Sequence, residues 1–83
     1  MNKIAVIGAV LDNPRESQHD FNEVLGAYKK IIKGRMGIPF EDEEISVVSI
    51  TVMGDLDDIN SLTGKLGNIK GVTVKTSISK KEI

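Results

Sequence analysis

The segment Ile31–Phe40 carries the residues best suited to hold a small molecule. Gly34 and Gly37 lack a Cβ, so the backbone amides beside them can closely approach a ligand or a partner strand. Arg35 supplies a forked cation that fits a carboxylate or a phosphate. The segment lacks the strand–turn–helix context of a phosphate loop, and a bulged edge strand explains the same glycines equally well. The candidate binding residues in this segment are Gly34, Arg35, Met36 and Gly37.

Residue types that usually perform catalysis or bind metals are scarce in this chain. The absence of cysteine excludes disulfides, thiolate zinc sites, iron–sulfur ligation and cysteine nucleophiles. The one histidine, His19, sits in an acidic helical stretch, where a solvated role is simpler than metal ligation or general-base catalysis. No serine has the context of a nucleophile elbow, and no Walker or dinucleotide glycine motif occurs. We expect no enzyme activity, no bound metal and no cofactor.

Charge and hydropathy restrict the partners. The 83 residues include 11 basic and 12 acidic side chains, and the net charge of −1 gives no long-range attraction to nucleic acid or to an anionic membrane. No apolar run approaches the ~20 residues that span a bilayer, and the first residues lack a signal-peptide pattern. The run Glu41–Glu44 lacks the spacing of a calcium loop and is interpreted as a solvated turn. We expect a cytoplasmic protein without membrane contact or direct nucleic-acid binding.

Hydrophobic periodicity predicts strands and helices in a regular order. Short runs rich in β-branched residues indicate strands, and apolar residues three and four positions apart indicate helices. Asn13 and Asp55 stand where helix N-caps are expected. Pro14 fits the first helical position after Asn13, and Glu16 stands where a capping box has its acid. The strands are predicted at Lys3–Leu11, Ile31–Pro39, Ile45–Met53 and Val72–Ser79, with helices beginning after Asn13 and after Asp55.

The order strand–helix–strand–strand–helix–strand predicts one ferredoxin-like α+β domain, βαββαβ, over residues 1–83. Two right-handed crossovers then interleave into a four-stranded antiparallel sheet with both helices on one face, and the first and third strands are central. Gly64 within the second helix suggests close packing, because a helical glycine costs about 1 kcal/mol against alanine. The tail Lys80–Ile83 is expected to fray.

Apolar residues on both sides of the two central strands are the strongest sign of self-association. Helices cover only one face of such a sheet, yet neither face of these strands is polar. A contiguous apolar patch usually marks an interface, and a domain this short buries only roughly 60–65% of its unfolded surface. We predict a homo-oligomer, a dimer or a tetramer, with Ile7, Val48, Ile50 and Val52 at the interface. The alternative is a monomer whose small residues and threonines tolerate water on this face.

Three stretches resemble a known family of small proteins. They are Ile32–Pro39 (IKGRMGIP), Ile45–Ile50 (ISVVSI) and Leu62–Gly67 (LTGKLG), which are similar to iron-only hydrogenase system regulators, and the resemblance covers essentially the whole chain. A fourth stretch, Leu66–Val74, resembles the passage from helix to last strand in ACT domains. The resemblance implies an ACT-like fold, similar to the C-terminal domain of nickel regulators, with oligomeric assembly and a regulatory role near iron-only hydrogenase assembly.

ACT-like assemblies bind small effectors where subunits meet, near the first strand–helix turn. The resemblance therefore implies that Asp12, Asn13 and Arg15 bind an effector, with the glycine-bearing segment facing them across an interface. Nickel-responsive relatives bind metal through several histidines and a cysteine, and that site does not carry over to a chain with only His19. Those relatives also have a ribbon–helix–helix DNA-binding segment, for which 83 residues leave no room.

Two other functions stay open. A protein-interaction subunit would dock through an edge strand or the apolar sheet face and would need no small ligand. An enzyme is the third hypothesis, because ferredoxin-like folds also host catalysts, although fold alone does not show function. We take the oligomeric effector-binding regulator as the leading hypothesis and the interaction subunit as its alternative.

Overall fold

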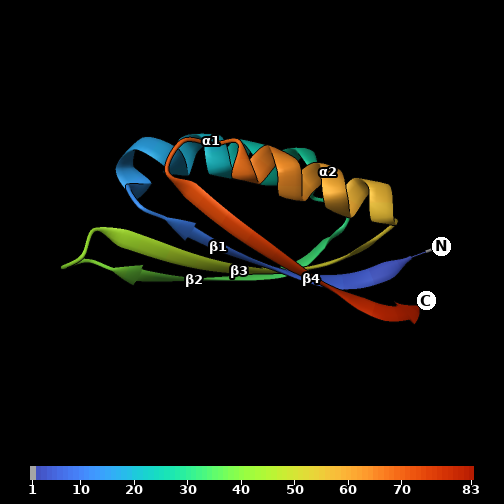
Figure 1. Ribbon diagram of the computed structural model, residues 1–83. Coiled ribbons are helices and arrows are strands. Elements are labelled where there is room, and N and C mark those ends of the chain that lie inside the picture. Colours follow the sequence, from blue (N-terminus) through green and yellow to red (C-terminus); the bar gives the residue numbers. More distant parts are fainter. Residues whose placement is uncertain (1) are drawn as a thin grey trace.

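The computed structural model describes residues 2–83 and places two helices as one layer over one sheet (Figure 1). The element order β1–α1–β2–β3–α2–β4 confirms the predicted ferredoxin-like α+β fold. The strands are β1 (Lys3–Leu11), β2 (Ile32–Phe40), β3 (Ile45–Gly54) and β4 (Val72–Glu82), and the helices are α1 (Pro14–Ala27) and α2 (Leu56–Gly67).

The sheet has the strand order β2–β3–β1–β4, and its neighbouring strands are antiparallel. The strands β1 and β3 are therefore central, as predicted. The tail that was expected to fray is instead part of β4, which runs to Glu82 opposite Lys3. The physical reason is continued backbone pairing, because the N–H of Ile83 donates a hydrogen bond to the carbonyl of Asn2 at 2.8 Å.

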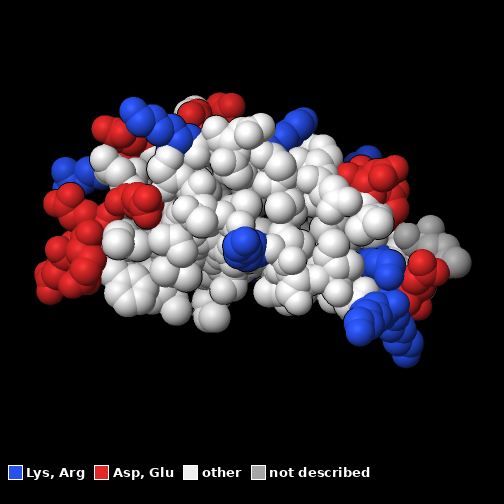
Figure 2. All heavy atoms as spheres, viewed as in Figure 1, with Lys and Arg blue, Asp and Glu red and all other residues white. Residues whose placement is uncertain are grey.

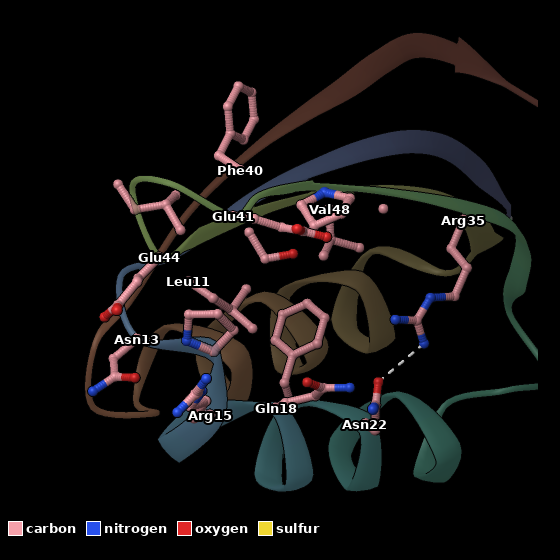
Figure 3. Close-up of a pocket in the computed structure, with 16 residues that line it drawn as sticks. Leu11, Asn13, Arg15, Gln18, Asn22, Arg35, Phe40, Glu41, Glu44 and Val48 are labelled. Carbon is pink, nitrogen blue, oxygen red and sulfur yellow. Dashed lines mark hydrogen bonds between the residues drawn. The ribbon is translucent and has the colours of Figure 1, made fainter.

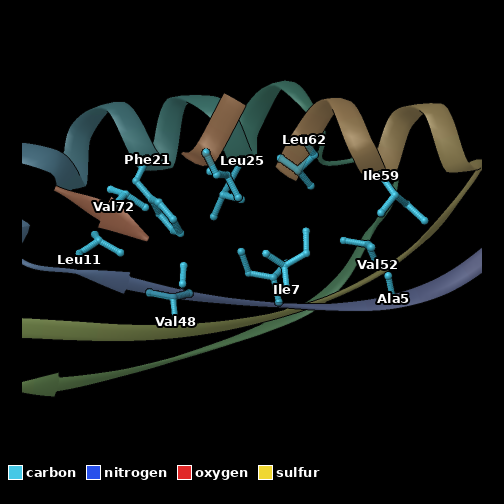
Figure 4. Packing of buried hydrophobic residues seen from close by; sticks show 13 residues of the cluster. Ala5, Ile7, Leu11, Phe21, Leu25, Val48, Val52, Ile59, Leu62 and Val72 are labelled. Carbon is cyan, nitrogen blue, oxygen red and sulfur yellow. The ribbon is translucent and has the colours of Figure 1, made fainter. Parts of the chain in front are cut away.

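Both helices lay one apolar stripe on the same side of the sheet (Figure 4). Phe21 and Leu25 recur four residues apart on α1, and Ile59 and Leu62 recur three apart on α2, as the helical period requires. All four side chains are buried. The core is therefore a single layer of side chains between the helices and one face of the sheet.

The residues predicted to form an interface lie in this core. Ile7, Val48, Ile50 and Val52 are at most 4% exposed because the helices cover them. Figure 4 shows three of them, Ile7, Val48 and Val52, beneath the helices. Their assignment to an intersubunit surface is therefore wrong. Strand alternation groups these residues correctly on one side, since Ile7 pairs with Ile50 and both face the helices. The alternation does not determine which of the two apolar sides of the sheet the helices cover.

The opposite side of the sheet, called the outer face below, has no helix over it (Figure 1). Strand register and alternation assign its residues, because paired residues in neighbouring antiparallel strands point to the same side. The outer face includes Ile4, Val6, Gly8 and Val10 of β1, Gly34, Met36, Ile38 and Phe40 of β2, Val47, Ser49, Thr51 and Met53 of β3, and Thr73, Lys75 and Ser77 of β4.

The edge strand β2 projects beyond the helix layer. Its pairing with β3 shifts register between Ile32 and Gly34, which confirms the predicted bulged edge strand. Residues 33–40 are exposed whichever side of the strand they point to. On the helix side, this overhang leaves open space between β2 and α1, and the candidate site occupies that space.

The two predicted helix caps differ in outcome. The carboxylate of Asp55 accepts a hydrogen bond from the backbone N–H of Asp58 at 2.9 Å, so Asp55 caps α2 as predicted. Asn13 precedes α1, but its side chain makes no capping hydrogen bond. The hydroxyl of Ser17 instead donates to the backbone carbonyl of Asn13 at 3.1 Å. The Asn13 amide is therefore not committed to the helix end and lines the cavity described next.

The close approach expected at Gly64 occurs elsewhere. A Cβ added at Gly64 would meet nothing within 4 Å, because this side of α2 faces solvent. At Gly54, by contrast, a Cβ would lie 2.8 Å from Cγ2 of Ile31. Packing therefore requires a glycine at Gly54, the last residue of β3, because the side chain of Ile31, just before β2, lies against it.

Candidate functional site

A cavity of about 560 Å³ opens between the first half of α1 and the hairpin of β2 and β3 (Figure 3). Small-molecule sites in proteins commonly measure roughly 300–1,000 Å³. The cavity lies on the helix side of the sheet, where β2 projects beyond α1. The overhang of β2 keeps this space open, because residues 33–40 of β2 are exposed.

The inner wall of the cavity is apolar because it is the end of the hydrophobic core. Leu11 of β1, Phe21 of α1 and Val48 of β3 contribute to it, and all three are nearly fully buried. Pro14 and Pro39 add two further apolar, rigid groups from opposite sides. An uncharged part of a ligand would be stabilised here by about 25 cal/mol for each Å² of apolar surface removed from water.

Arg35 extends from β2 across the cavity toward α1 (Figure 3). Its Nη1 donates a hydrogen bond to Oδ1 of Asn22 at 3.2 Å. A guanidinium has five N–H donors, and this bond uses one of them. The contact restrains a long flexible side chain and leaves its forked face suited to a carboxylate or a phosphate.

Charges of both signs lie at the other end of the cavity. Arg15 comes from the first turn of α1, and Glu41 and Glu44 come from the turn that joins β2 to β3 (Figure 3). The N–H of Glu44 donates to the carbonyl of Glu41 at 3.2 Å, and Glu44 has a φ of 56°. That left-handed conformation is uncommon for a residue with a side chain, and here it closes the four-residue turn between β2 and β3.

The structure places the seven predicted binding residues in three different surroundings. Asn13, Arg15, Arg35 and Gly37 line the cavity together. Gly34 and Met36 lie on the side of β2 that faces away from the helices, because Gly34 pairs with Thr51 and Met36 with Ser49. The backbone N–H of Asp12 donates to the carbonyl of Gly71 at 2.8 Å, which directs that residue toward β4. The strand–helix turn and the glycine segment meet within one chain.

Sequence reasoning missed two polar residues of α1 that line the cavity, Gln18 and Asn22. They lie three and seven positions after the predicted Arg15, so the three residues share one side of the helix. This spacing is a signal that the sequence does contain. Glu41 and Glu44 were interpreted only as solvated turn residues, and nothing local in the sequence indicates that the turn folds beside α1.

A second group of polar side chains joins the two helices. The hydroxyls of Tyr28, the residue that follows α1, and of Ser61 on α2 are 2.6 Å apart, and Nζ of Lys65 lies 5.4 Å from the centre of the Tyr28 ring. The hydrogen bond with Ser61 lowers the pKa of Tyr28, and the neighbouring Lys65 lowers it further. These polar atoms are exposed at the surface, so we interpret the group as a contact that stabilises the packing of α1 against α2.

We expect Tyr28 to ionise below the usual tyrosine pKa of about 10. The fold favours the tyrosinate, so this contribution to stability is present above the unfolded pKa and is lost as pH falls through the lower folded pKa. Absorbance titration in the near ultraviolet measures the folded midpoint, and it reports Tyr28 alone because the chain has one tyrosine and no tryptophan. Ser61→Ala should raise the midpoint, and Ser77→Ala on β4 should not. A midpoint indifferent to Ser61→Ala would contradict the assignment.

Other ionisable groups of the described chain form no metal centre. Among residues 2–83, no group of three or more histidine, cysteine, aspartate or glutamate side chains is arranged to hold a metal ion. His19 is a surface residue whose Nε2 lies 2.9 Å from Oε2 of Glu23, one helical turn away. Within the same residues, neither helix is long and apolar enough to cross a membrane.

Comparison with known families gives one match that covers most of the chain. A family model described as "TM1266-like: Iron-only hydrogenase system regulator, putative" matches residues 3–76. The solved structure of uncharacterized protein TM1266 from Thermotoga maritima is similar, with a TM-score of 0.92. Its sequence identity is 30%, over 96% of this chain and 100% of that chain. A search of curated proteins finds no match.

More distant structures share only the fold. The C-terminal domain of the MgtC protein from Mycobacterium tuberculosis has a TM-score of 0.68 and 13% identity, over 94% of this chain and 88% of that one. SnoaB, a cofactor-independent oxygenase from Streptomyces nogalater, has a TM-score of 0.60 and 12% identity, over 100% of this chain and 96% of that one. At such identities the likeness carries no information on activity.

Proposed function

We propose, from the premise that this chain belongs to the TM1266-like family, that it is a regulatory module linked to an iron-only hydrogenase system. The module acts as an ACT-like homo-oligomer in the cytoplasm, and it binds a small effector in the cavity between α1 and the β2–β3 hairpin. The family is described as a regulator, and a regulator needs a site that senses a signal. It needs no catalytic group.

The observation that carries this proposal is the Arg35 side chain held against Asn22 at the rim of an apolar cavity. Burying an uncharged group against Phe21 would contribute affinity, and a charge-assisted hydrogen bond to the guanidinium would fix the orientation of the ligand. The effector is therefore a small molecule with an apolar part and a carboxylate or phosphate group.

A thermal-shift screen of small carboxylates and phosphates tests the proposal. An effector at one hundred times its dissociation constant should stabilise the fold by about 2.7 kcal/mol, which for a domain of this size raises the melting temperature by roughly 10–20 °C. Isothermal titration of each hit should then show that Arg35→Gln weakens binding by about 10–100-fold, since a hydrogen bond to a charged group contributes about 1.5–3 kcal/mol.

Lys33→Gln is the matched control for that experiment. Lys33 is an exposed cation on the same strand, two residues from Arg35, and it does not line the cavity. Its substitution should leave the affinity unchanged. Equal losses in the two variants would show a general effect of charge on β2, and a screen without any shift would count against effector binding.

A protein-interaction subunit remains the second candidate, and the apolar outer face favours it. Val6 and Met36 on this face are 48% and 62% exposed, which is unusual for side chains of this kind in a folded sheet. A docking partner would cover them without using the cavity. The two candidates therefore separate experimentally, because substitutions at Arg35 would leave such docking intact.

A further inference from the structure

The outer face exposes apolar side chains on β1 and β2, the two strands that flank β3. Val6, Met36, Ile38 and Phe40 are each between 46% and 62% exposed, and Ile4 is 38% exposed. Figure 3 shows the ring of Phe40 turned away from the cavity, toward this face. Apolar side chains in such a cluster mark a surface that another molecule covers.

The chain also exposes more surface than its mass predicts. Its accessible area is 5567 Å², whereas folded monomers of 9.0 kDa expose about 4,900 Å². The molecule measures 41 × 18 × 16 Å, so the outer face along its long axis has an area of roughly 700 Å². Each partner in a standard interface buries about 800 Å². One face of one further copy therefore offers nearly the area that each partner of a standard interface buries.

Figure 2 shows an acidic cluster at the end of the long axis that holds the β2–β3 turn, and basic side chains beside acidic ones at the other end. The turn Glu41–Glu44 forms an acidic cluster at one end of the sheet. Lys3, Lys80 and Lys81 lie at the other end, near Glu82, and they make that end of the sheet net positive. The acids at the start of α2 share this end, but they belong to the helix layer on the opposite side of the sheet.

Two-fold symmetry allows two ways to pack the outer faces together. The axis lies in the plane between the sheets in both, because the same surface must face itself. If the axis runs along the strands, the two acidic turns share one end and repel each other. If it runs across the strands, the acidic turn of each copy meets the basic end of the other. Only the second arrangement is favoured by the charge distribution.

We propose that a second copy of this chain covers the outer face, with its strands running in the reverse direction. Asp42 and Glu43 of one protomer then lie at the same end of the dimer as Lys80 and Lys81 of its partner, displaced sideways by roughly two strand spacings, about 10 Å. Charges at that separation still attract each other at low salt. The inference deepens the proposed function, because it rests on the self-association included there and names its geometry. It does not depend on effector binding.

The strand register also fixes the centre of this dimer. Met36, Ser49, Gly8 and Lys75 form one row across the sheet, midway between the acidic turn and the basic end. In the reversed arrangement, this row lies over its own copy, so Met36 meets Met36 of the partner. Lys75 also approaches its own copy, but it is on the edge strand, where its long side chain reaches solvent.

Sedimentation of the full chain tests whether the outer face is an interface. The wild-type chain should sediment as a dimer or a higher oligomer at micromolar concentration, and Val6→Lys should weaken association by at least about 100-fold, because it buries an unpaired charge. Leu56→Lys is the matched control. Leu56 is 43% exposed, like Val6, but lies on α2, so its substitution should leave association unchanged.

Charge reversal tests the orientation. Asp42→Lys with Glu43→Lys, or Lys80→Glu with Lys81→Glu, should weaken the dimer by about tenfold at low salt, and the four substitutions together should restore it. The positions at the hairpin do not line the cavity, so the same variants should still bind an effector. Failure of the combined variant to recover would overturn the reversed orientation.

A single introduced cysteine gives an independent measurement, because the natural chain has none. Met36→Cys should oxidise to a disulfide-linked dimer, whereas Asn60→Cys on α2 should not. If the two-fold axis instead ran along the strands, Met36 would lie over β4 of the partner, too far from its own copy to cross-link. A wild-type monomer would overturn this inference together with self-association in the proposed function. A dimer without cross-link or charge rescue would overturn the geometry alone.

Discussion

Ile50→Ala will destabilise the fold by about 2–5 kcal/mol, the range found for large-to-small substitutions in cores. Ile50 is 0% exposed at the centre of β3, and it faces the layer of helix side chains that includes Ile59 and Leu62. Truncation removes transfer free energy and leaves a cavity that the surrounding side chains fill only in part. Since small domains have only about 5–15 kcal/mol of stability, this is a large fraction of the total.

The change is measured by urea unfolding at one fixed protein concentration, because self-association would add to apparent stability. With m of about 1–3 kcal/mol/M, the midpoint should fall by roughly 1–3 M, and the melting temperature by roughly 10–30 °C. Leu56→Ala is the control. It removes a side chain of the same size from a site that is 43% exposed, and it should cost below about 1 kcal/mol. Equal losses at the two positions would show that Ile50 is not a core residue.

Substitutions in the core cannot test whether this protein has an interface. A charged residue at Val48 or Ile50 would unfold the chain, because both side chains lie beneath the helices. Loss of association in such a variant would say nothing about docking. Val6 and Met36 are the positions where a charge tests the outer face without entering the core.

Gly54→Ala will destabilise the fold by about 1–3 kcal/mol, although it adds only one methyl group. The added Cβ would lie 2.8 Å from Cγ2 and 3.2 Å from Cβ of Ile31. Ile31 cannot simply move away, because its carbonyl accepts a hydrogen bond from the N–H of Met53 at 2.8 Å and its side chain packs against the core. Thermal unfolding of the variant measures the loss.

Gly64→Ala is the matched control and should have the opposite sign. A Cβ there meets nothing within 4 Å, and alanine is the better helix former by about 0.8–1.0 kcal/mol, so α2 should gain stability. In a double-mutant cycle, Gly54→Ala should cost less in an Ile31→Ala background, where Cγ2 and Cδ1 are gone. Additive effects of the Gly54 and Ile31 substitutions would show that their contact is not the cause.

The candidate site depends on the same packing that places these glycines. The chain from Ile31 crosses Gly54 closely before β2 begins, and β2 then projects past α1. That projection brings Arg35 within hydrogen-bonding distance of Asn22 and opens the cavity between them. A substitution that shifts the entry into β2, such as Gly54→Ala, should therefore also weaken effector binding.

The sequence by itself determined the element types and their order. Period-two runs and period-three-to-four stripes mark strands and helices through local backbone geometry, so the βαββαβ order and the central positions of β1 and β3 follow from pattern and topology. The Asp55 cap and the acidic turn are equally local, since each involves neighbours within a few residues. The bulge in β2 was predicted from its two glycines for the same reason.

Only the tertiary structure decided which side of the sheet the helices cover. Both sides of β1 and β3 are apolar, so alternation groups the residues of each side but does not determine which side the helices cover. Ile7 and Ile50 were therefore assigned to an interface, although they lie in the core. The cavity likewise joins α1 to a hairpin distant in sequence, and such a contact depends on how far β2 projects past the helix layer. Long-range packing sets that distance, and no local propensity encodes it.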